Sequence, residues 1–155
     1  REVGTTTGRQ RRCGWFDAVV ARHSVAVNGL DGIALTKLDV LQGLSEIRLC
    51  VAYRDPANGR LVERFPASLE RLKALEPVYE TFPGWDEPLG DIRSLDVLPE
   101  TCQAYLARIA EVCGCPIHVV SVGPEREQTL VLRDPFPPGD ATACEAAIVA
   151  PGALS

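Results

Sequence analysis

The sequence has no methionine, and only two of its 16 basic residues are lysines. Since a translated gene begins with methionine, this absence predicts a C-terminal piece of a longer protein. The alternative is a processed leader followed by a Met-free mature chain. Apolar runs are broken within about ten residues, far short of the roughly 20 that cross a bilayer, and no charged and then apolar leader opens the chain. We therefore expect neither a membrane span nor secretion.

A basic surface and a disulfide framework are also missing. The net charge of -5 comes from dispersed charges, which argues against a nucleic-acid partner. The six cysteines are irregularly spaced in a chain of 155 residues, which is long enough to form a core without disulfides, so we expect free thiols in the reducing cytoplasm. The phosphate-binding pattern Gly-x-x-x-x-Gly-Lys-Ser/Thr does not occur, which excludes a phosphate loop of that type from these residues.

What is present is an alternation of helical and strand patterns in a chain with 46% hydrophobic residues. This alternation predicts one α/β domain around a mixed sheet, with a β-hairpin arm over residues 46–65. Residues 137–155 show no convincing period, and we expect a loose tail there. The expected helices cover residues 15–28, 68–75 and 99–113, and the expected strands cover residues 32–41, 47–53, 61–65, 77–82, 117–122 and 126–132.

The densest motif runs from Gly4 to Arg12, where two glycines bracket three threonines and three arginines follow. Glycines allow a tight backbone whose N–H groups point into one concavity, hydroxyls add donors, and guanidinium groups match the oxygens of a carboxylate or phosphate. The helix expected from residue 15 would add the positive end of its dipole. The motif predicts an anion site. The alternative is a Gly/Thr turn with solvated arginines.

A second motif, Lys37-Leu38-Asp39, belongs to an apolar strand pattern. Strand alternation would point Lys37 and Asp39 to the same side, where the carboxylate can accept hydrogen bonds from N1–H and the amine of guanine while the lysine stem lies along the purine. The alternative is a surface ion pair. The segment Ser121–Gly123 follows another buried strand, at the carboxyl edge where open α/β sheets bind ligands.

Three soft metal ligands, Cys113, Cys115 and His118, lie within six residues and could hold zinc. The pattern around them predicts a turn from a helix to a strand, and no fourth ligand is near in sequence. We therefore expect no metal site. His23 lies in the middle of an expected helix without a second ligand nearby, so we expect a surface or packing residue.

The string REVGTTTGRQRRCGWFD, Arg1–Asp17, resembles the substrate loop of adenylosuccinate synthetases, the GTP-dependent ligases that join L-aspartate to IMP. Thr36–Asp39 matches the guanine-recognition motif of that family, and the resemblance runs to about Phe136. It implies the C-terminal part of a P-loop-like nucleotide-binding α/β fold. Residues 1–136 would form the family region, and residues 137–155 fall outside its pattern.

The resemblance implies a cytoplasmic, homodimeric, Mg²⁺-dependent ligase of purine biosynthesis with GTP, IMP and L-aspartate as its partners. The phosphate loop, the Mg²⁺ ligands and the catalytic residues would lie in the N-terminal part, so no catalytic residue is expected here and the piece alone would be inactive. Two alternatives remain, a non-catalytic guanine-nucleotide-binding module and a degenerate gene fragment. The resemblance assigns the L-aspartate and IMP site to Thr5, Thr6, Thr7, Gly8, Arg9, Gln10 and Arg11, with Arg9 also reaching IMP, and the GTP site to Arg11, Lys37, Leu38, Asp39, Ser121, Val122 and Gly123.

Overall fold

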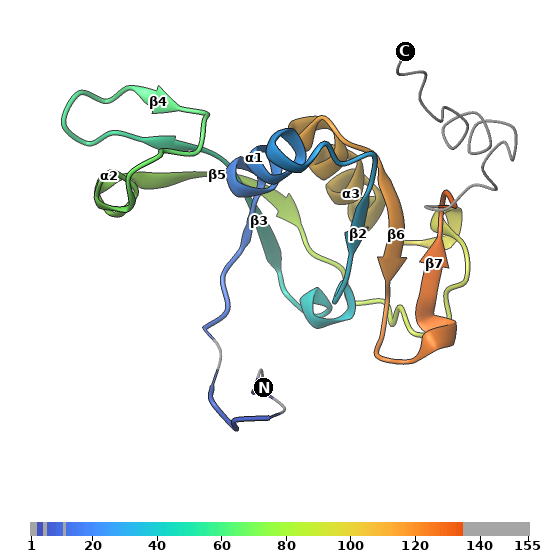
Figure 1. The fold of residues 1–155 in the computed structure, drawn as a ribbon. Helices are drawn as coiled ribbons and strands as arrows, with labels where there is room; N and C mark the ends of the chain where they lie inside the picture. Colours follow the sequence, from blue (N-terminus) through green and yellow to red (C-terminus); the bar gives the residue numbers. More distant parts are fainter. Residues whose placement is uncertain (1–2, 5, 11, 135–155) are drawn as a thin grey trace, which may run out of the picture.

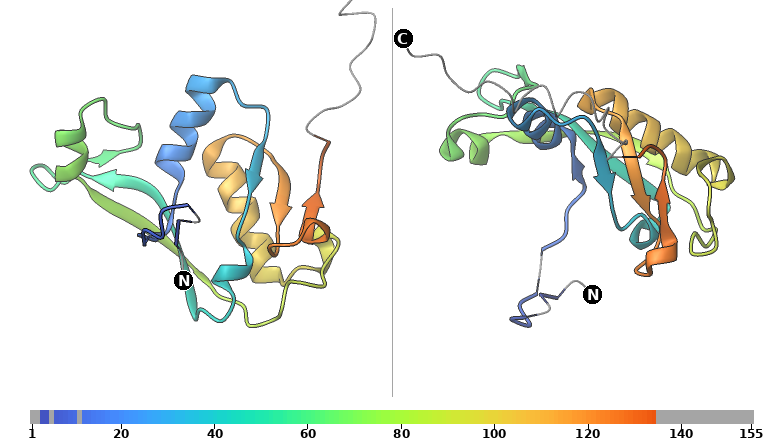
Figure 2. Two further views of the ribbon diagram at one scale, coloured as in Figure 1. Left: turned by 60° about the horizontal axis from the view of Figure 1, so that its bottom comes forward. Right: turned by 45° about the vertical axis from the view of Figure 1, so that its right-hand side comes forward.

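The computed structural model describes residues 3–4, 6–10 and 12–134. Figure 1 shows two sheets with helix α3 (Glu100–Cys113) against them, and Figure 2 shows the same arrangement from two further sides. One buried core joins side chains of both sheets and of α3, among them Leu49, Ile109 and Val120. The fold class is therefore α/β, as the sequence predicts.

The first sheet has β3 (Glu46–Arg54) at its centre. The short strand β1 (Phe16–Asp17) pairs with β3 in parallel. Two further strands, β4 (Leu61–Val62) and β5 (Glu76–Pro83), pair with β3 in the antiparallel direction. This sheet is therefore mixed, and β3 joins all of its other strands.

The second sheet contains β2 (Ile33–Leu35), β6 (Ile117–Ser121) and β7 (Thr129–Val131). β2 is parallel to β6, and β7 is antiparallel to β6. The prediction of a single mixed sheet is wrong in number, because the described strands form two mixed sheets. Within the described residues β2 pairs with β6, whereas β3 pairs with β1, β4 and β5, so β2 and β3 do not share a ladder.

The predicted hairpin over residues 46–65 is present as β3 and β4, and a further strand from outside this range, β5, also pairs with β3. The far end of β3 pairs with β4 on one side and with the start of β5 on the other. Helix α2 (Leu69–Ala74) connects these two strands, and its start is capped by the hydroxyl of Ser68, as predicted. Figure 1 shows β4 and α2 projecting together from the body.

Helix α1 (Ala18–Asn28) starts later than the predicted residue 15. Phe16 and Asp17 are extended instead because they pair with β3, and the Asp17 carboxylate accepts hydrogen bonds from two N–H groups of the first turn at 3.0 and 3.2 Å. The predicted end is confirmed, since Gly29 caps the helix in the left-handed conformation.

We expect Asp17→Ala to lower the free energy of unfolding by about 1–3 kcal/mol. The change removes the helix cap, and it also removes the acceptor of the Tyr53 hydroxyl, which donates to Asp17 at 2.7 Å from a buried position. Urea unfolding followed by tryptophan fluorescence measures the loss. Asp17→Asn keeps an oxygen acceptor in the same place and should cost less, so equal losses for the two variants would contradict this account.

Of the remaining elements, α2, α3, β5 and β6 are close to their predicted ranges, whereas β2, expected over residues 32–41, and β4, expected over residues 61–65, are shorter. Helix α3 agrees with the prediction over residues 99–113 and ends at Gly114, whose φ is 64°. The strand expected over residues 126–132 is shorter, because its first part forms a 3₁₀ turn before β7.

No helix in the described part of the chain is both long and apolar enough to cross a membrane. The predicted tail lies outside the described residues. The three 3₁₀ turns of the described residues are η1 (Asp39–Leu41), η2 (Leu95–Val97) and η3 (Arg126–Gln128).

Candidate functional site

The two segments predicted to bind guanine lie side by side. β2 and β6 are parallel neighbours, so their carboxyl ends reach the same edge of the second sheet. Just beyond these ends, the Leu38 N–H donates to the carbonyl oxygen of Ser121 at 3.2 Å. We call residues 36–39 and 121–123 the carboxyl edge. The sequence separates its two halves by about half of the chain, and the fold brings them into direct contact.

The conformation of Lys37-Leu38-Asp39 differs from the one predicted. β2 ends at Leu35, Lys37 is left-handed with φ 66°, and Asp39 opens η1. Strand alternation therefore does not set the directions of Lys37 and Asp39, and that part of the prediction is wrong. The Leu38 side chain is instead buried in the core at 1% exposure, which anchors the motif between its two charged neighbours. Lys37 is not a glycine, so its left-handed backbone conformation is strained, and strained conformations of this kind often occur at binding sites.

The other half of the carboxyl edge is held by its own hydrogen bonds. The Ser121 hydroxyl donates to the carbonyl oxygen of Gly123 at 2.7 Å, and the Val122 N–H donates to the carbonyl oxygen of Gln128 at 2.8 Å. Val122 and Gly123 are buried. The segment is therefore a fixed turn rather than a loose loop end.

The opening loop forms a small closed turn. Val3 bridges to Gln10, the Gly4 N–H donates to the carbonyl oxygen of Arg9 at 2.9 Å, and the Gly8 N–H donates to the carbonyl oxygen of Gly4 at 2.8 Å. Gly8 has φ 63°, which explains a glycine at that position. The prediction that glycine N–H groups point into an anion site is wrong for Gly4 and Gly8, because both donate within the loop.

The side chains of the opening loop surround a concavity of about 520 Å³ that opens to solvent. Thr6, Thr7, Arg9 and Gln10 are exposed and can reach a ligand. Figures 1 and 2 show the loop projecting from β1 on the side of the molecule where η1 lies. Thr5 and Arg11, which belong to the predicted site, lie outside the described residues. The residues around the concavity are Gly4, Thr7, Arg9, Gln10 and Arg12.

The start of α1 does not contribute to this site as predicted. Its first N–H groups donate to the Asp17 carboxylate, which is itself an anion. The extended segment before α1 also separates the helix from Arg12. The positive end of the helix dipole therefore stabilises a side chain of the protein and is not available to a ligand.

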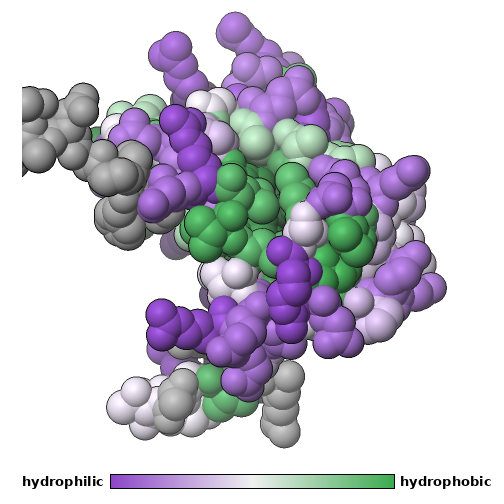
Figure 3. Space-filling view, turned by 90° about the vertical axis from the view of Figure 1, so that its right-hand side faces the viewer, coloured by the Kyte–Doolittle hydropathy of each residue, from purple (hydrophilic) through white to green (hydrophobic). Residues whose placement is uncertain are grey.

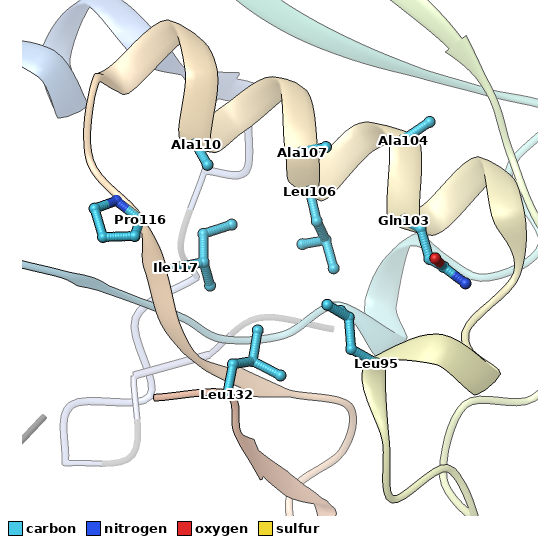
Figure 4. A pocket seen from close by; sticks show the side chains of 9 residues that line it. All are labelled: Leu95, Gln103, Ala104, Leu106, Ala107, Ala110, Pro116, Ile117 and Leu132. Carbon is cyan, nitrogen blue, oxygen red and sulfur yellow. The ribbon is translucent and has the colours of Figure 1, made fainter. Parts of the chain in front are cut away.

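A groove of about 470 Å³ lies between α3, the start of β6, Leu95 of η2 and Leu132 just after β7, on the face shown in Figure 3, where apolar side chains gather. In Figure 4, Leu106 and Ile117 face Leu132 and Leu95 across this groove. Gln103 is the single polar residue in its lining, and the Gln103 amide donates to the carbonyl oxygen of Leu98 at 2.8 Å. The groove thus offers no cation to a phosphate or a carboxylate, and the candidate site lies elsewhere.

The described residues contain no group of three His, Cys, Asp or Glu side chains that could hold a metal ion. Cys113, Cys115 and His118 are buried, and burial raises the pKa of both thiols, which keeps them protonated. His23 is exposed on α1, and its ring stacks on Phe65 with centroids 5.2 Å apart. This geometry confirms the prediction that His23 is a surface or packing residue.

Gln128 was missed by the motifs above, although it touches the carboxyl edge. The segment Glu125-x-x-Gln128 has the spacing of a capping box, in which two side chains satisfy the first N–H groups of a helical turn. The structure contains this box at η3. The spacing could therefore have identified Gln128 as an organising residue from the sequence alone.

Parallel strands whose carboxyl ends meet at one edge are the arrangement in which open α/β sheets bind ligands, and they define the class of this protein as α/β. Residues 1–130 match the sequence profile of the family described as adenylosuccinate synthetase. The chain belongs to the adenylosuccinate synthetase family.

Individual relatives agree with this assignment. The chain is 56% identical over 135 residues to an adenylosuccinate synthetase of Moorella thermoacetica, a match that covers 87% of this chain and 31% of the relative. It is 49% identical to adenylosuccinate synthetase 1, chloroplastic, of Ricinus communis, with 88% of this chain and 30% of the relative covered. A solved structure, that of fully ligated adenylosuccinate synthetase from Plasmodium falciparum, superposes with a TM-score of 0.81 at 42% identity and covers 85% of this chain and 32% of that chain. The chain therefore spans about a third of the length of these relatives.

Proposed function

We propose that this chain supplies the guanine-reading edge and the aspartate loop of a GTP-dependent ligase that joins IMP and L-aspartate to form adenylosuccinate in purine biosynthesis. The observation that carries this proposal is the hydrogen bond from the Leu38 N–H to the Ser121 carbonyl oxygen, which unites the two predicted guanine segments. Family membership supports the reaction class.

Guanine recognition is assigned to the carboxyl edge. Asp39 is half-buried at the start of η1, where its carboxylate can accept from N1–H and the 2-amine of guanine. Adenine offers no such pair of donors, so a carboxylate buried against it would lose its partners. The exposed side chain of Lys37 can lie along the purine ring. Ser121, Val122 and Gly123 would border the base from the neighbouring strand end.

Aspartate recognition is assigned to the opening loop. L-aspartate carries two carboxylates, and a bidentate guanidinium is the side chain that fits one best. Arg9 provides such a group in the concavity of the loop and would also reach IMP. The hydroxyls of Thr6 and Thr7 and the amide of Gln10 add polar contacts on exposed positions. Thr5 and Arg11 complete the proposed loop, with Arg11 extending toward the GTP phosphates.

The remaining parts of the enzyme are assigned to the rest of a longer polypeptide. We propose that this chain is the C-terminal portion, with residues 1–136 as the family region and 137–155 as a tail outside it. The described residues offer no group of three ligands for a metal, so the Mg²⁺ that balances phosphate charge would be held by the other portion. The full-length enzyme would be a cytoplasmic homodimer.

A chimaeric synthetase tests the proposal. In it, the segment of the Moorella thermoacetica enzyme that matches this chain over 135 residues is replaced by the corresponding residues of this chain. We expect the chimaera to form adenylosuccinate from GTP, IMP and L-aspartate with a kcat/KM within about tenfold of the parent enzyme, since ordinary surface substitutions cost little. A folded chimaera without activity would overturn the proposed function.

The isolated 155-residue chain should show no synthetase activity in the same assay, because the phosphate loop is absent from its sequence. A coupled assay for phosphate release with GTP, IMP and L-aspartate measures this directly. Turnover by the pure chain would contradict the assignment of the catalytic groups to another portion. Guanine-selective binding by the chain, together with an inactive chimaera, would favour the non-catalytic binding module.

A further inference from the structure

Gln128 connects three segments beside the carboxyl edge. Its side-chain oxygen accepts from the Glu125 N–H at 3.0 Å, and its side-chain nitrogen donates to the carbonyl oxygen of Gly90 at 3.2 Å. Its backbone carbonyl accepts from the Val122 N–H at 2.8 Å. Both ends of the amide are therefore used, and one residue fixes the turn after β6 to the loop that precedes η2.

The Gln128 side chain also explains the glycine at position 123. A Cβ atom built on Gly123 would lie 2.1 Å from the Gln128 side-chain oxygen and 2.5 Å from its Cδ. The φ of Gly123 is not left-handed, so the backbone itself does not require glycine there. The requirement comes from the close approach of the Gln128 amide to the backbone of the turn.

We propose that Gln128 is a positioning residue that sets the geometry of the guanine-reading edge. The Gln128 side chain packs against Gly123, whose carbonyl oxygen accepts from the Ser121 hydroxyl, and the Ser121 carbonyl oxygen in turn accepts from the Leu38 N–H and so fixes the residue before Asp39. A carboxylate that reads two donors must be held to within about 0.5 Å of its working position. The inference rests on the proposed function, because it concerns how Asp39 is placed for the base.

The chemistry of the side chain is specific to glutamine. Its amide donates to one carbonyl and accepts from one N–H at the same time. Glutamate at this position could accept from the Glu125 N–H but could not donate to Gly90 when ionised, and methionine could do neither. The Gln128→Glu variant therefore removes the hydrogen bond to the Gly90 carbonyl oxygen and keeps the one from the Glu125 N–H.

A double-mutant cycle in the 155-residue chain tests the packing directly. Gly123→Ala should lower the midpoint of urea unfolding strongly, because the new methyl group meets the Gln128 amide. In the Gln128→Ala background the same Gly123→Ala change should cost much less, since all three nearest atoms belong to the removed side chain. Additive effects of the two changes would overturn the proposed contact.

Kinetics of the chimaeric synthetase test the positioning role. Gln128→Ala should raise the KM for GTP about tenfold, because GTP binding must then order a turn that the Gln128 side chain no longer fixes, and should leave the KM values for IMP and L-aspartate within about twofold. Gln128→Glu should fall between wild type and Gln128→Ala. Asp17→Ala, which weakens the fold away from the carboxyl edge, should leave the KM for GTP unchanged. An unchanged KM for GTP in Gln128→Ala, or an equal rise in Asp17→Ala, would overturn the proposal.

The two tests also separate this inference from the proposed function. If the wild-type chimaera did not prefer GTP over ATP, the assignment of the guanine site would fail. The unfolding cycle would still decide whether Gln128 fixes the turn at Gly123, because it uses no nucleotide.

Discussion

In the chimaeric synthetase, Asp39→Asn is expected to lower kcat/KM for GTP by about 10³-fold and to improve the use of xanthosine triphosphate. In the proposed site the carboxylate accepts from N1–H and the 2-amine of guanine, whereas the asparagine amide would present one donor that faces the amine. Xanthine has a carbonyl oxygen in place of that amine and can accept from the new donor. Steady-state kinetics with each nucleotide at saturating IMP and L-aspartate measure the change in preference.

A carboxylate on the arm provides the matched control. Glu63 is exposed and follows β4, so Glu63→Gln removes the same charge without touching the carboxyl edge. It should leave both the rate with GTP and the preference between nucleotides unchanged. If Asp39→Asn kept the nucleotide preference of the parent, the base-reading role of Asp39 would be wrong, whatever happened to the overall rate.

The elements with strong patterns were predictable from the sequence. The apolar period of α3, closed by Gly114, and the alternation in β3 both lead to nearly the observed ranges. The start of α1 was not predictable, because Trp15 and Phe16 continue the apolar pattern of the helix, whereas the pairing of Phe16 and Asp17 with β3 keeps those two residues extended. Pairing between distant strands is a tertiary effect that a local period does not contain.

The conformation of the candidate site was not predictable from the sequence. Lys37 and Asp39 were expected inside a strand over residues 32–41, but β2 ends at Leu35 and the left-handed φ of Lys37 removes them from the strand period. In the opening loop, the N–H groups of Gly4 and Gly8, which the sequence pattern offers to a ligand, donate within the loop itself. Backbone donors that a sequence offers to a ligand are often satisfied first by the fold. Side-chain donors on exposed positions are predicted more reliably than backbone donors, because the hydrogen bonds of the backbone fold do not use them.

Arg9→Leu in the chimaera should therefore act through its guanidinium. Arg9 is exposed in the concavity of the opening loop, and its backbone is fixed by the bond from the Gly4 N–H to its carbonyl oxygen, which leucine retains. We expect the KM for L-aspartate to rise about 10²-fold, or kcat to fall by a similar factor, because a bidentate charged contact is lost. The KM for GTP should stay within about twofold, since Lys37 and Asp39 are intact.

Two companion variants sharpen this test. Arg9→Lys keeps the charge but loses the planar fork, so it should recover only part of the loss if the contact to the carboxylate is bidentate. Arg60→Leu removes an exposed arginine on the arm and should change none of the kinetic constants. Full recovery by lysine would show that charge alone is needed at this position. Unchanged L-aspartate kinetics in Arg9→Leu would remove Arg9 from the site and leave the concavity as a solvated turn.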